Sequence, residues 1–292
     1  MRPCGAGGGA AGWWRSRGLR SRRRCSRSSP SRAAGTETGA RAPARRRLLA
    51  PGGPTASASK PVVNGTPQPN WTTRTGPVPI LEYHVLGVAP ADAPYPELYV
   101  TRPDFRRRME WLDRNGCEAV TLDQVQRAWY PKGRLPPKPV VISFDDGYRP
   151  QFTFALPELR RHGWAGVLNL KEKGSDLYTS NVEAMIAAGW ELASHTINHL
   201  DLTTLDAATL ERELEGSRAI LWRDYGVGVN NFCYPAGRYD ATVIAAVKAA
   251  GYTGAMTEIP GDASRNYPYE LDRFEILGSS GVEGLAADLA SG

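Results

Sequence analysis

Short apolar runs alternate with longer segments of helical periodicity beyond residue 100. Each apolar run spans six or seven residues and is hydrophobic almost throughout, which is typical of strands buried on both faces of a sheet. These runs predict five buried strands, PVVISF (139–144), WAGVLNL (164–170), WELASH (190–195), NNFCYP (230–235) and YTGAMT (252–257).

Between the predicted strands, apolar residues recur every three or four positions, as on one face of a helix. In residues 102–116 this face holds Phe105, Met109 and Leu112, and Gly116 is a helix stop. Ser180 and Glu183 predict a capping box at the start of another helix. Similar patterns predict helices in 180–189, 205–226 and 240–251.

Alternating strands and helices indicate an α/β fold with a parallel sheet or barrel. In such folds the chemistry gathers at the carboxyl ends of the strands. Asp145 and Asp146 follow one predicted strand, His195 ends another and Pro235 ends a third. We therefore expect these residues to meet at one rim.

The net charge of +6 conceals two unlike regions. Residues 1–60 hold 13 Arg and Lys60 against Glu37, about +13, whereas the remaining residues hold 22 basic and 29 acidic side chains, about −7. The basic region is rich in Arg, Gly, Ser and Pro and lacks a periodic apolar face, so we predict that residues 1–76 are a disordered segment and linker. Residues 77–292 are then the folded domain.

Three interpretations of the basic segment stay open: an arm that makes non-specific contacts with nucleic acid or another anionic surface, an export signal, or sequence upstream of the true start. No apolar run approaches the roughly 18 residues that a membrane span needs. Cys117 and Cys233 match no CxxC spacing and predict neither a metal knuckle nor a disulfide framework.

The stretch VVISFDDGYRP places Asp145 and Asp146 side by side at the end of a buried strand. A strand often ends in Asp and Gly simply to make a turn. Two adjacent carboxylates also repel each other unless a cation or a proton lies between them, which would indicate a site.

A histidine pair offers the second half of such a site. His195 and His199 are four residues apart, but Thr196 stands where a zincin protease would need Glu. The pair could cap, pack or bind a metal. Combined with a carboxylate from the DDG turn, two imidazoles would suit a catalytic divalent ion, zinc above others, with positions left for water and substrate.

The motifs SFDDGY, SHTINH and FCYPAGRYD, in that order, resemble the polysaccharide deacetylase family, also called the NodB-homology domain or family 4 carbohydrate esterases. The similarity extends over roughly residues 78–280. It implies a distorted (β/α)7-type barrel, with Asp145 as the catalytic base and a metal bound by Asp146, His195 and His199.

A fourth motif resembles the permuted branch of this family, which includes poly-N-acetylglucosamine deacetylases. That branch places an LxxH segment at the start of the domain, and here LEYH ends at His84, which the resemblance makes the general acid. A strand histidine bonded to a backbone carbonyl is the other interpretation. The resemblance also implies that Tyr148, Tyr234 and Pro235 line the substrate cleft, although an aromatic residue after a turn often only packs.

The third motif departs from the family. Cys233 stands where the family has an Arg that steadies the base, and Ala236 stands at an aromatic position. The backbone N–H of Ala236 can still serve as the oxyanion donor that the resemblance implies. Arg273 could supply the missing guanidinium, or it could be a surface charge at a strand end; both interpretations stay open.

Together these features predict a metal-dependent hydrolase that removes N-acetyl groups from an amino-sugar polymer of the peptidoglycan, poly-N-acetylglucosamine or chitin type. The alternatives are an acetyl-ester hydrolase on acetylated xylan and an inactive glycan-binding domain. The resemblance implies an acetylated glycan as partner and an extracellular or cell-surface location, and the sequence predicts no oligomeric state.

Overall fold

The computed structural model describes residues 68–130 and 133–291. Most of the predicted basic segment and linker therefore lies outside the described residues. Its last part, residues 68–76, packs on the domain instead: Trp71 is buried, its Nε1 donates to Glu118 Oε2 at 3.2 Å, and Trp129 Nε1 donates to the Gly76 carbonyl at 2.9 Å. The domain boundary predicted at residue 77 is corrected for this reason.

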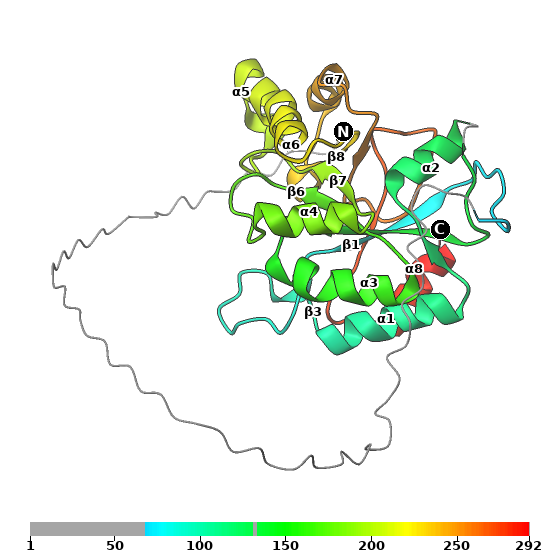
Figure 1. The fold of residues 1–292 in the computed structure, drawn as a ribbon. Helices are drawn as coiled ribbons and strands as arrows, with labels where there is room; N and C mark the ends of the chain where they lie inside the picture. The colour runs from blue at the N-terminus through cyan, green and yellow to red at the C-terminus, as the bar shows by residue number, and fades with distance from the viewer. Residues whose placement is uncertain (1–67, 131–132, 292) are drawn as a thin grey trace, which may run out of the picture. The chain divides into compact units, whose positions relative to one another are not determined.

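In the part of the chain that the structure describes, the main sheet has nine strands, and seven strands that run parallel make up its body (Figure 1). On one side of the first strand the remaining strands follow in chain order, and the last strand pairs with its other side. In spatial order they are β11 (Phe274–Glu275), β1 (Val78–Tyr83), β5 (Pro139–Asp145), β6 (Val167–Leu170), β7 (Glu191–Ser194), β8 (Asn231–Cys233) and β9 (Gly254–Met256).

The segment that contains β11 connects the two edges of this curled sheet. At its start, Leu271 exchanges backbone hydrogen bonds with Ala255 and Thr257, at and just beyond the end of β9. Three residues later Phe274 pairs with Leu81 of β1. The predicted α/β fold, a distorted barrel, is confirmed by this arrangement.

Among the described residues, two short strands add to this sheet and two more form a small sheet of their own. β10 (Asp262–Ala263) pairs antiparallel with the start of β1, β4 (Glu118–Ala119) pairs with the start of β5, and β2 (Val85–Leu86) pairs with β3 (Tyr99–Val100).

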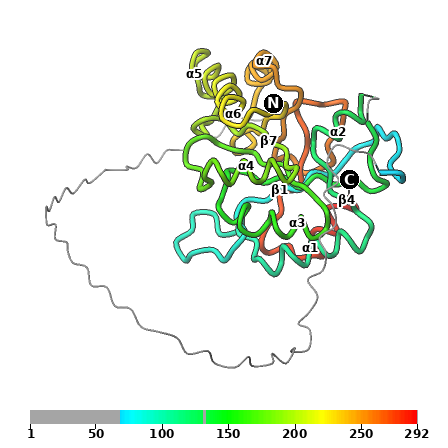
Figure 2. The backbone as a smooth tube through the Cα atoms, in the orientation of Figure 1, coloured from blue at the N-terminus to red at the C-terminus, as the bar shows by residue number. Residues whose placement is uncertain are grey.

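Helices surround the sheet, and Figure 1 shows α1, α3 and α4 one above another across the strands. The trace in Figure 2 shows the C-terminal segment returning to α1, where Arg108 donates to the carbonyls of Leu277 and Gly281. The helices are α1 (Arg102–Arg114), α2 (Leu122–Trp129), α3 (Leu156–His162), α4 (Thr179–Ala187), α5 (Ala207–Glu211), α6 (Ser217–Tyr225), α7 (Ala241–Ala249) and α8 (Gly281–Ser291).

Local sequence accounts for most of the helix ends. Asp206 and Asp240 accept hydrogen bonds from backbone N–H groups three residues on, which satisfies donors that a helix start leaves free. The capping box predicted at Ser180 is wrong, because α4 begins at Thr179 and the backbone N–H of Tyr178 is bonded to Asn181 Oδ1. The helix predicted over 205–226 is α5 and α6 joined by a π-helical turn at Arg212–Gly216.

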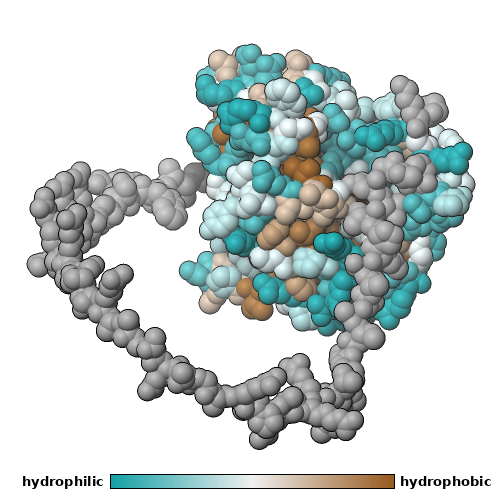
Figure 3. Space-filling model, in the orientation of Figure 1, coloured by the Kyte–Doolittle hydropathy of each residue, from teal (hydrophilic) through white to brown (hydrophobic). Residues whose placement is uncertain are grey.

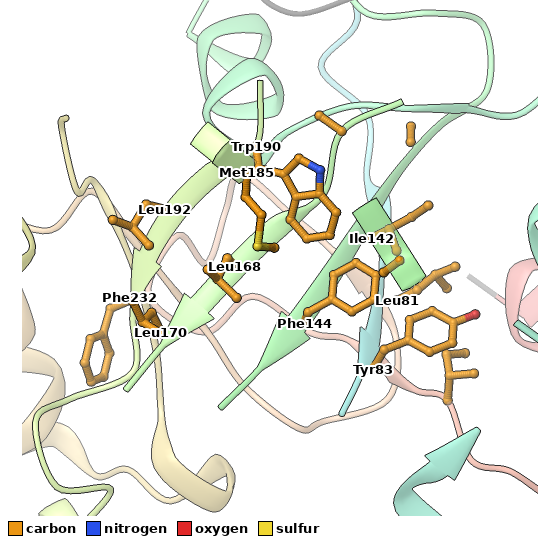
Figure 4. Close-up of a cluster of buried hydrophobic side chains, with 14 of the residues drawn as sticks. Leu81, Tyr83, Ile142, Phe144, Leu168, Leu170, Met185, Trp190, Leu192 and Phe232 are labelled. Carbon is orange, nitrogen blue, oxygen red and sulfur yellow. The ribbon is translucent and has the colours of Figure 1, made fainter. Parts of the chain in front are cut away.

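Two apolar layers lie on the two faces of the curled sheet. The outer layer packs against the helices, and in Figure 4 Phe144 lies between Tyr83 and Trp190, with ring centroids 5.7 and 5.0 Å away. Burying each such side chain contributes about 1.5–3 kcal/mol. The inner layer fills the barrel with small and medium side chains, namely Ile80, Val141, Val167, Ala193, Cys233, Met256 and Leu271.

Helix α2 closes the amino end of the barrel. Its Leu122, Val125 and Trp129 belong to the inner apolar layer, while Gln126 donates to Asn231, the first residue of β8. The carboxyl end is left for the loops after the strands. On the outer surface, Figure 3 shows a largely hydrophilic face with limited apolar patches. Within residues 68–130 and 133–291, no helix has the length and apolar character that crossing a bilayer requires.

Candidate active site

Strained backbone marks the loops at the carboxyl ends of β5, β7 and β8. Among the described residues, the non-glycine positions with positive φ are Asp146 (73°), Thr196 (67°), His199 (54°) and Ala236 (49°). This conformation costs a residue with a Cβ about 1–2 kcal/mol. Such strain tends to occur at functional sites, where the surrounding structure enforces it, and here all four residues lie in the loops that follow these strands.

These loops border a cleft of about 660 Å³. Seven of the residues singled out from the sequence line it: His84, Asp146, Tyr148, His195, His199, Pro235 and Ala236. Convergence of segments more than 100 residues apart explains why no single motif could define the cleft.

Asp145 lies beneath the cleft, fully enclosed. Its Oδ1 accepts hydrogen bonds from Asn169 Nδ2 at 2.6 Å and Arg273 Nη1 at 3.0 Å, and its Oδ2 accepts one from the Cys233 thiol at 3.3 Å. Burial alone would raise the pKa of Asp145, but the charge of Arg273 outweighs it and holds that pKa well below its usual range. Asp145 is therefore ionised at neutral pH.

Arg273 is the guanidinium whose position the sequence left open. It is completely buried, donates to the Thr257 carbonyl at 2.6 Å, and forms ion pairs with Asp145 and with Glu82, the latter at 3.1 Å. The surface-charge interpretation is excluded by this burial. Cys233 takes the adjacent space, and burial raises the pKa of its thiol well above the usual value, so the thiol stays protonated and donates.

Asp146, His195 and His199 are brought together. Their ligand atoms all lie within 4.8 Å of one another, and Asp146 Oδ1 is 4.0 Å from His195 Nε2 and 3.8 Å from His199 Nε2. Asp146 Oδ1 is buried and accepts no hydrogen bond of good geometry from the part of the chain that the structure describes, although the Lys171 ammonium is 3.0 Å away. An unsatisfied buried oxygen facing two imidazoles fits a divalent cation.

The protonation of His195 fits a metal as well. His195 Nδ1 is 2.9 Å from the Cys233 carbonyl, which can only accept, so Nδ1 carries the proton and Nε2 is left with a lone pair. Burial lowers the pKa of His195 to about 4, which keeps the ring neutral as a ligand must be.

His84 directly follows β1, which pairs with β5, the strand that ends at Asp145. Its Nε2 lies 3.6 Å from Glu82 Oε1, and its side chain is 13 % exposed. His84, Glu82 and Asp145 present ligand atoms within 4.8 Å of one another. An imidazole therefore reaches the cleft beside the buried carboxylate.

Comparison with known proteins bears on this geometry. Residues 132–255 match the sequence model of the polysaccharide deacetylase family. The match includes the DDG, histidine and YPAG motifs but neither His84 nor Arg273. YxkH of Bacillus subtilis (strain 168), named as a polysaccharide deacetylase, is 28% identical over 220 residues, which cover 74% of this chain and 76% of YxkH.

Over residues 132–255 the chain therefore resembles polysaccharide deacetylases, and the similarity to YxkH extends over 74% of the chain. Poly-beta-1,6-N-acetyl-D-glucosamine N-deacetylase of Escherichia coli (strain K12) is 37% identical over 63 residues, 22% of this chain and 9% of that protein. The structure of the Streptococcus pyogenes deacetylase PplD in complex with acetate has the same fold, with a TM-score of 0.68 and 24% identity over 74% of this chain and 99% of PplD.

One residue that the sequence predicts in the cleft lies elsewhere in the structure. Tyr234 is buried in the outer apolar layer, where its hydroxyl donates to the Tyr269 carbonyl at 3.0 Å and its ring stacks on Tyr239 at 4.7 Å. Because side chains alternate along a strand, Cys233 faces the barrel interior and Tyr234 faces outward. The prediction that Tyr234 contacts substrate is corrected; its neighbours Pro235 and Ala236 do reach the cleft.

Three polar residues of the candidate site are not predicted from the sequence: Glu82, Asn169 and Lys171. Each is a polar side chain within or just after an apolar run, in ILEYH or GVLNLK. Glu82 and Asn169 lie two residues before His84 and Lys171, which directly follow β1 and β6. Because side chains alternate along a strand, each residue of a pair points to the same inward face. Polar residues at inward positions were the signal that could have identified them.

Proposed function

We propose that this chain is a metal-dependent deacetylase that removes N-acetyl groups from an amino-sugar polymer. The observation that carries the proposal is Asp145, a buried carboxylate kept ionised by Arg273 beside a trio of two imidazoles and one carboxylate under an open cleft. A charged base next to a Lewis acid is one arrangement that can hydrolyse an amide at neutral pH.

Asp146, His195 and His199 would hold the divalent ion, zinc being the first choice for this ligand set. When bound, the ion would polarise the attacking water and the acyl oxygen. Asp145 would take the proton from that water. Arg273, Asn169 and Cys233 fix both oxygens of Asp145, so the base is held in place before the substrate arrives.

Two further groups would act on the substrate. The backbone N–H of Ala236, held in the left-handed conformation at the cleft, would donate to the oxyanion that forms as water attacks the acyl carbon. His84, whose Nε2 lies 3.6 Å from Glu82 Oε1, would protonate the departing amine. Tyr148 and Pro235 would contact the sugar.

The lining of the cleft favours an amino-sugar polymer over an acidic one. Besides Asp146 it carries four carboxylates, and its one arginine, Arg238, is ion-paired with Asp201 at 2.8 Å. Those four carboxylates belong to Glu97, Asp201, Glu258 and Glu275. The negative electrostatic potential of these carboxylates repels anionic sugars and suits a polymer whose product units carry ammonium groups. The name of the Escherichia coli relative supports poly-N-acetylglucosamine among the candidates. An extracellular or cell-surface location follows if such a polymer is the substrate.

Acetate release from a panel of polymers tests this function. We expect zinc-reconstituted protein to release acetate from N-acetylglucosamine oligomers and to lose that activity on chelation. Preferential release from acetylated xylan would favour the ester-hydrolase alternative instead. Binding of the oligomers without release by metal-loaded protein would favour an inactive glycan-binding domain.

A further inference from the structure

Lys171 lies against the proposed metal trio although no motif includes it. It follows β6 directly, and its Nζ is 3.0 Å from Asp146 Oδ1. Its side chain is only 17 % exposed, and its ammonium is 5.7 Å from the centroid of the Tyr148 ring. Alternation along β6 places Asn169 and Lys171 on the same inward face, so one strand delivers an amide to Asp145 and an ammonium to Asp146.

The position of the ammonium conflicts with a metal on the same carboxylate. Asp146 Oδ1, the oxygen nearest Lys171, is also the oxygen that faces the Nε2 atoms of His195 and His199. A divalent ion bound by the trio would also be coordinated by that oxygen. Two cations a few ångströms apart repel each other strongly where water is largely excluded.

We propose that Lys171 is a positioning residue that competes with the metal for Asp146 and thereby sets how tightly the site holds its ion. The proposal rests on the metal trio of the proposed function. The ammonium lies over Tyr148 at the cleft wall, so it can leave the carboxylate for the open cleft when a metal binds. Lys171 then keeps the affinity for the metal moderate, and its ammonium pairs with the Asp146 carboxylate when no metal is bound.

A purely structural ion pair makes a different prediction. If Lys171 only anchored the loop after β6, its loss would lower the free energy of unfolding and leave metal affinity unchanged or weaker, since the ligands would be less well held. The sign of the change in metal affinity therefore distinguishes the two roles.

The test measures zinc affinity of the metal-stripped full-length protein by competition with a chromophoric chelator. We expect Lys171→Met and Lys171→Gln to bind Zn²⁺ about tenfold tighter than the wild type, because the repulsion between the ammonium and the metal ion is removed. Lys171→Arg keeps the charge and should stay close to the wild-type affinity. Lys173→Met is the matched control, because Lys173 is a lysine of the same loop, two residues along, whose side chain is exposed.

Thermal unfolding supplies a second readout. Without added zinc, Lys171→Gln should unfold at a lower temperature than the wild type, because Asp146 loses its cation; with saturating zinc its gain in melting temperature should exceed that of the wild type. Wild type and variants that bind equally, or variants that bind more weakly, would overturn it and leave the proposed function standing. Absence of zinc binding in every protein would overturn both.

Discussion

The barrel holds a buried carboxylate near each of its two ends, and their surroundings are opposite in kind. At the carboxyl end, Asp145 faces the guanidinium of Arg273. At the amino end, Glu191 accepts hydrogen bonds from Asn231 Nδ2 at 2.7 Å and from the Asp123 N–H at 2.8 Å, and the nearby charged group is the carboxylate of Asp123.

The two carboxyl groups titrate in opposite directions. Burial raises the pKa of Glu191 to about 8, and Asp123 adds to the shift. Burial acts on Asp145 in the same sense, yet Arg273 reverses the result and lowers that pKa. The comparison teaches that burial raises the pKa at both ends of the barrel, and that the Arg273 guanidinium, hydrogen-bonded to Asp145, keeps on that carboxyl group the charge that general-base chemistry needs.

Removing the cation should have the largest effect. Arg273→Met leaves Asp145 buried without its counter-charge, and breaking such a pair from one side costs about 3–5 kcal/mol. Urea unfolding should show this loss, and deacetylation should fall with it. Arg265→Met is the control, because Arg265 is exposed. A loss for Arg273→Met below about 1 kcal/mol would contradict the role assigned to the guanidinium.

Glu191, at the amino end of the barrel, should make the free energy of unfolding depend on pH. Since the folded pKa of Glu191 lies above its unfolded value, its stabilising contribution is fully present below the unfolded pKa and is lost as the pH rises through about 8. Glu191→Gln cannot ionise, so the wild type should lose about 1–3 kcal/mol more than this variant between pH 5 and 8. Glu211→Gln, at an exposed helix position, should behave as the wild type does. Parallel pH profiles for the wild type and Glu191→Gln would rule out a protonated Glu191.

The thiol beside Asp145 should matter least. Cys233→Ala removes one weak hydrogen bond and a small volume, for about 1–2 kcal/mol in unfolding. Because Arg273 and Asn169 still hold Asp145, deacetylation should fall less than tenfold, and Cys233→Ser, which keeps a donor, should fall less still. Abolished acetate release in both variants would show that Arg273 does not replace the family arginine.

The fold and the centre of the candidate site could be predicted because each rests on a local pattern. Apolar runs marked β5 to β9, and Asp145, Asp146, His195 and Pro235 stand at strand ends, where a parallel sheet must bring them together. The placement of Arg273 could not be predicted, because β11 is two residues long and its pairing with β1 spans almost 200 residues.

The errors have a common physical origin, namely which side chains of a strand face the barrel interior and which face outward. Tyr234 was placed in the cleft and Lys171 was overlooked because a run of buried residues does not reveal which side chains face inward. Which side chains face inward is set by register with neighbouring strands, such as the pairing of Cys233 with Met256. A one-residue difference in register would exchange the interior and exterior sets.

Acetate release by Asp145→Asn tests the central claim most directly. The variant keeps the shape of the side chain but removes the charge that accepts a proton, so zinc-loaded Asp145→Asn should release acetate from N-acetylglucosamine oligomers at least about 100-fold more slowly than the wild type. Asp92→Asn, at an exposed position, should retain full activity. Release by folded Asp145→Asn at the wild-type rate would contradict the assignment of Asp145 as the base.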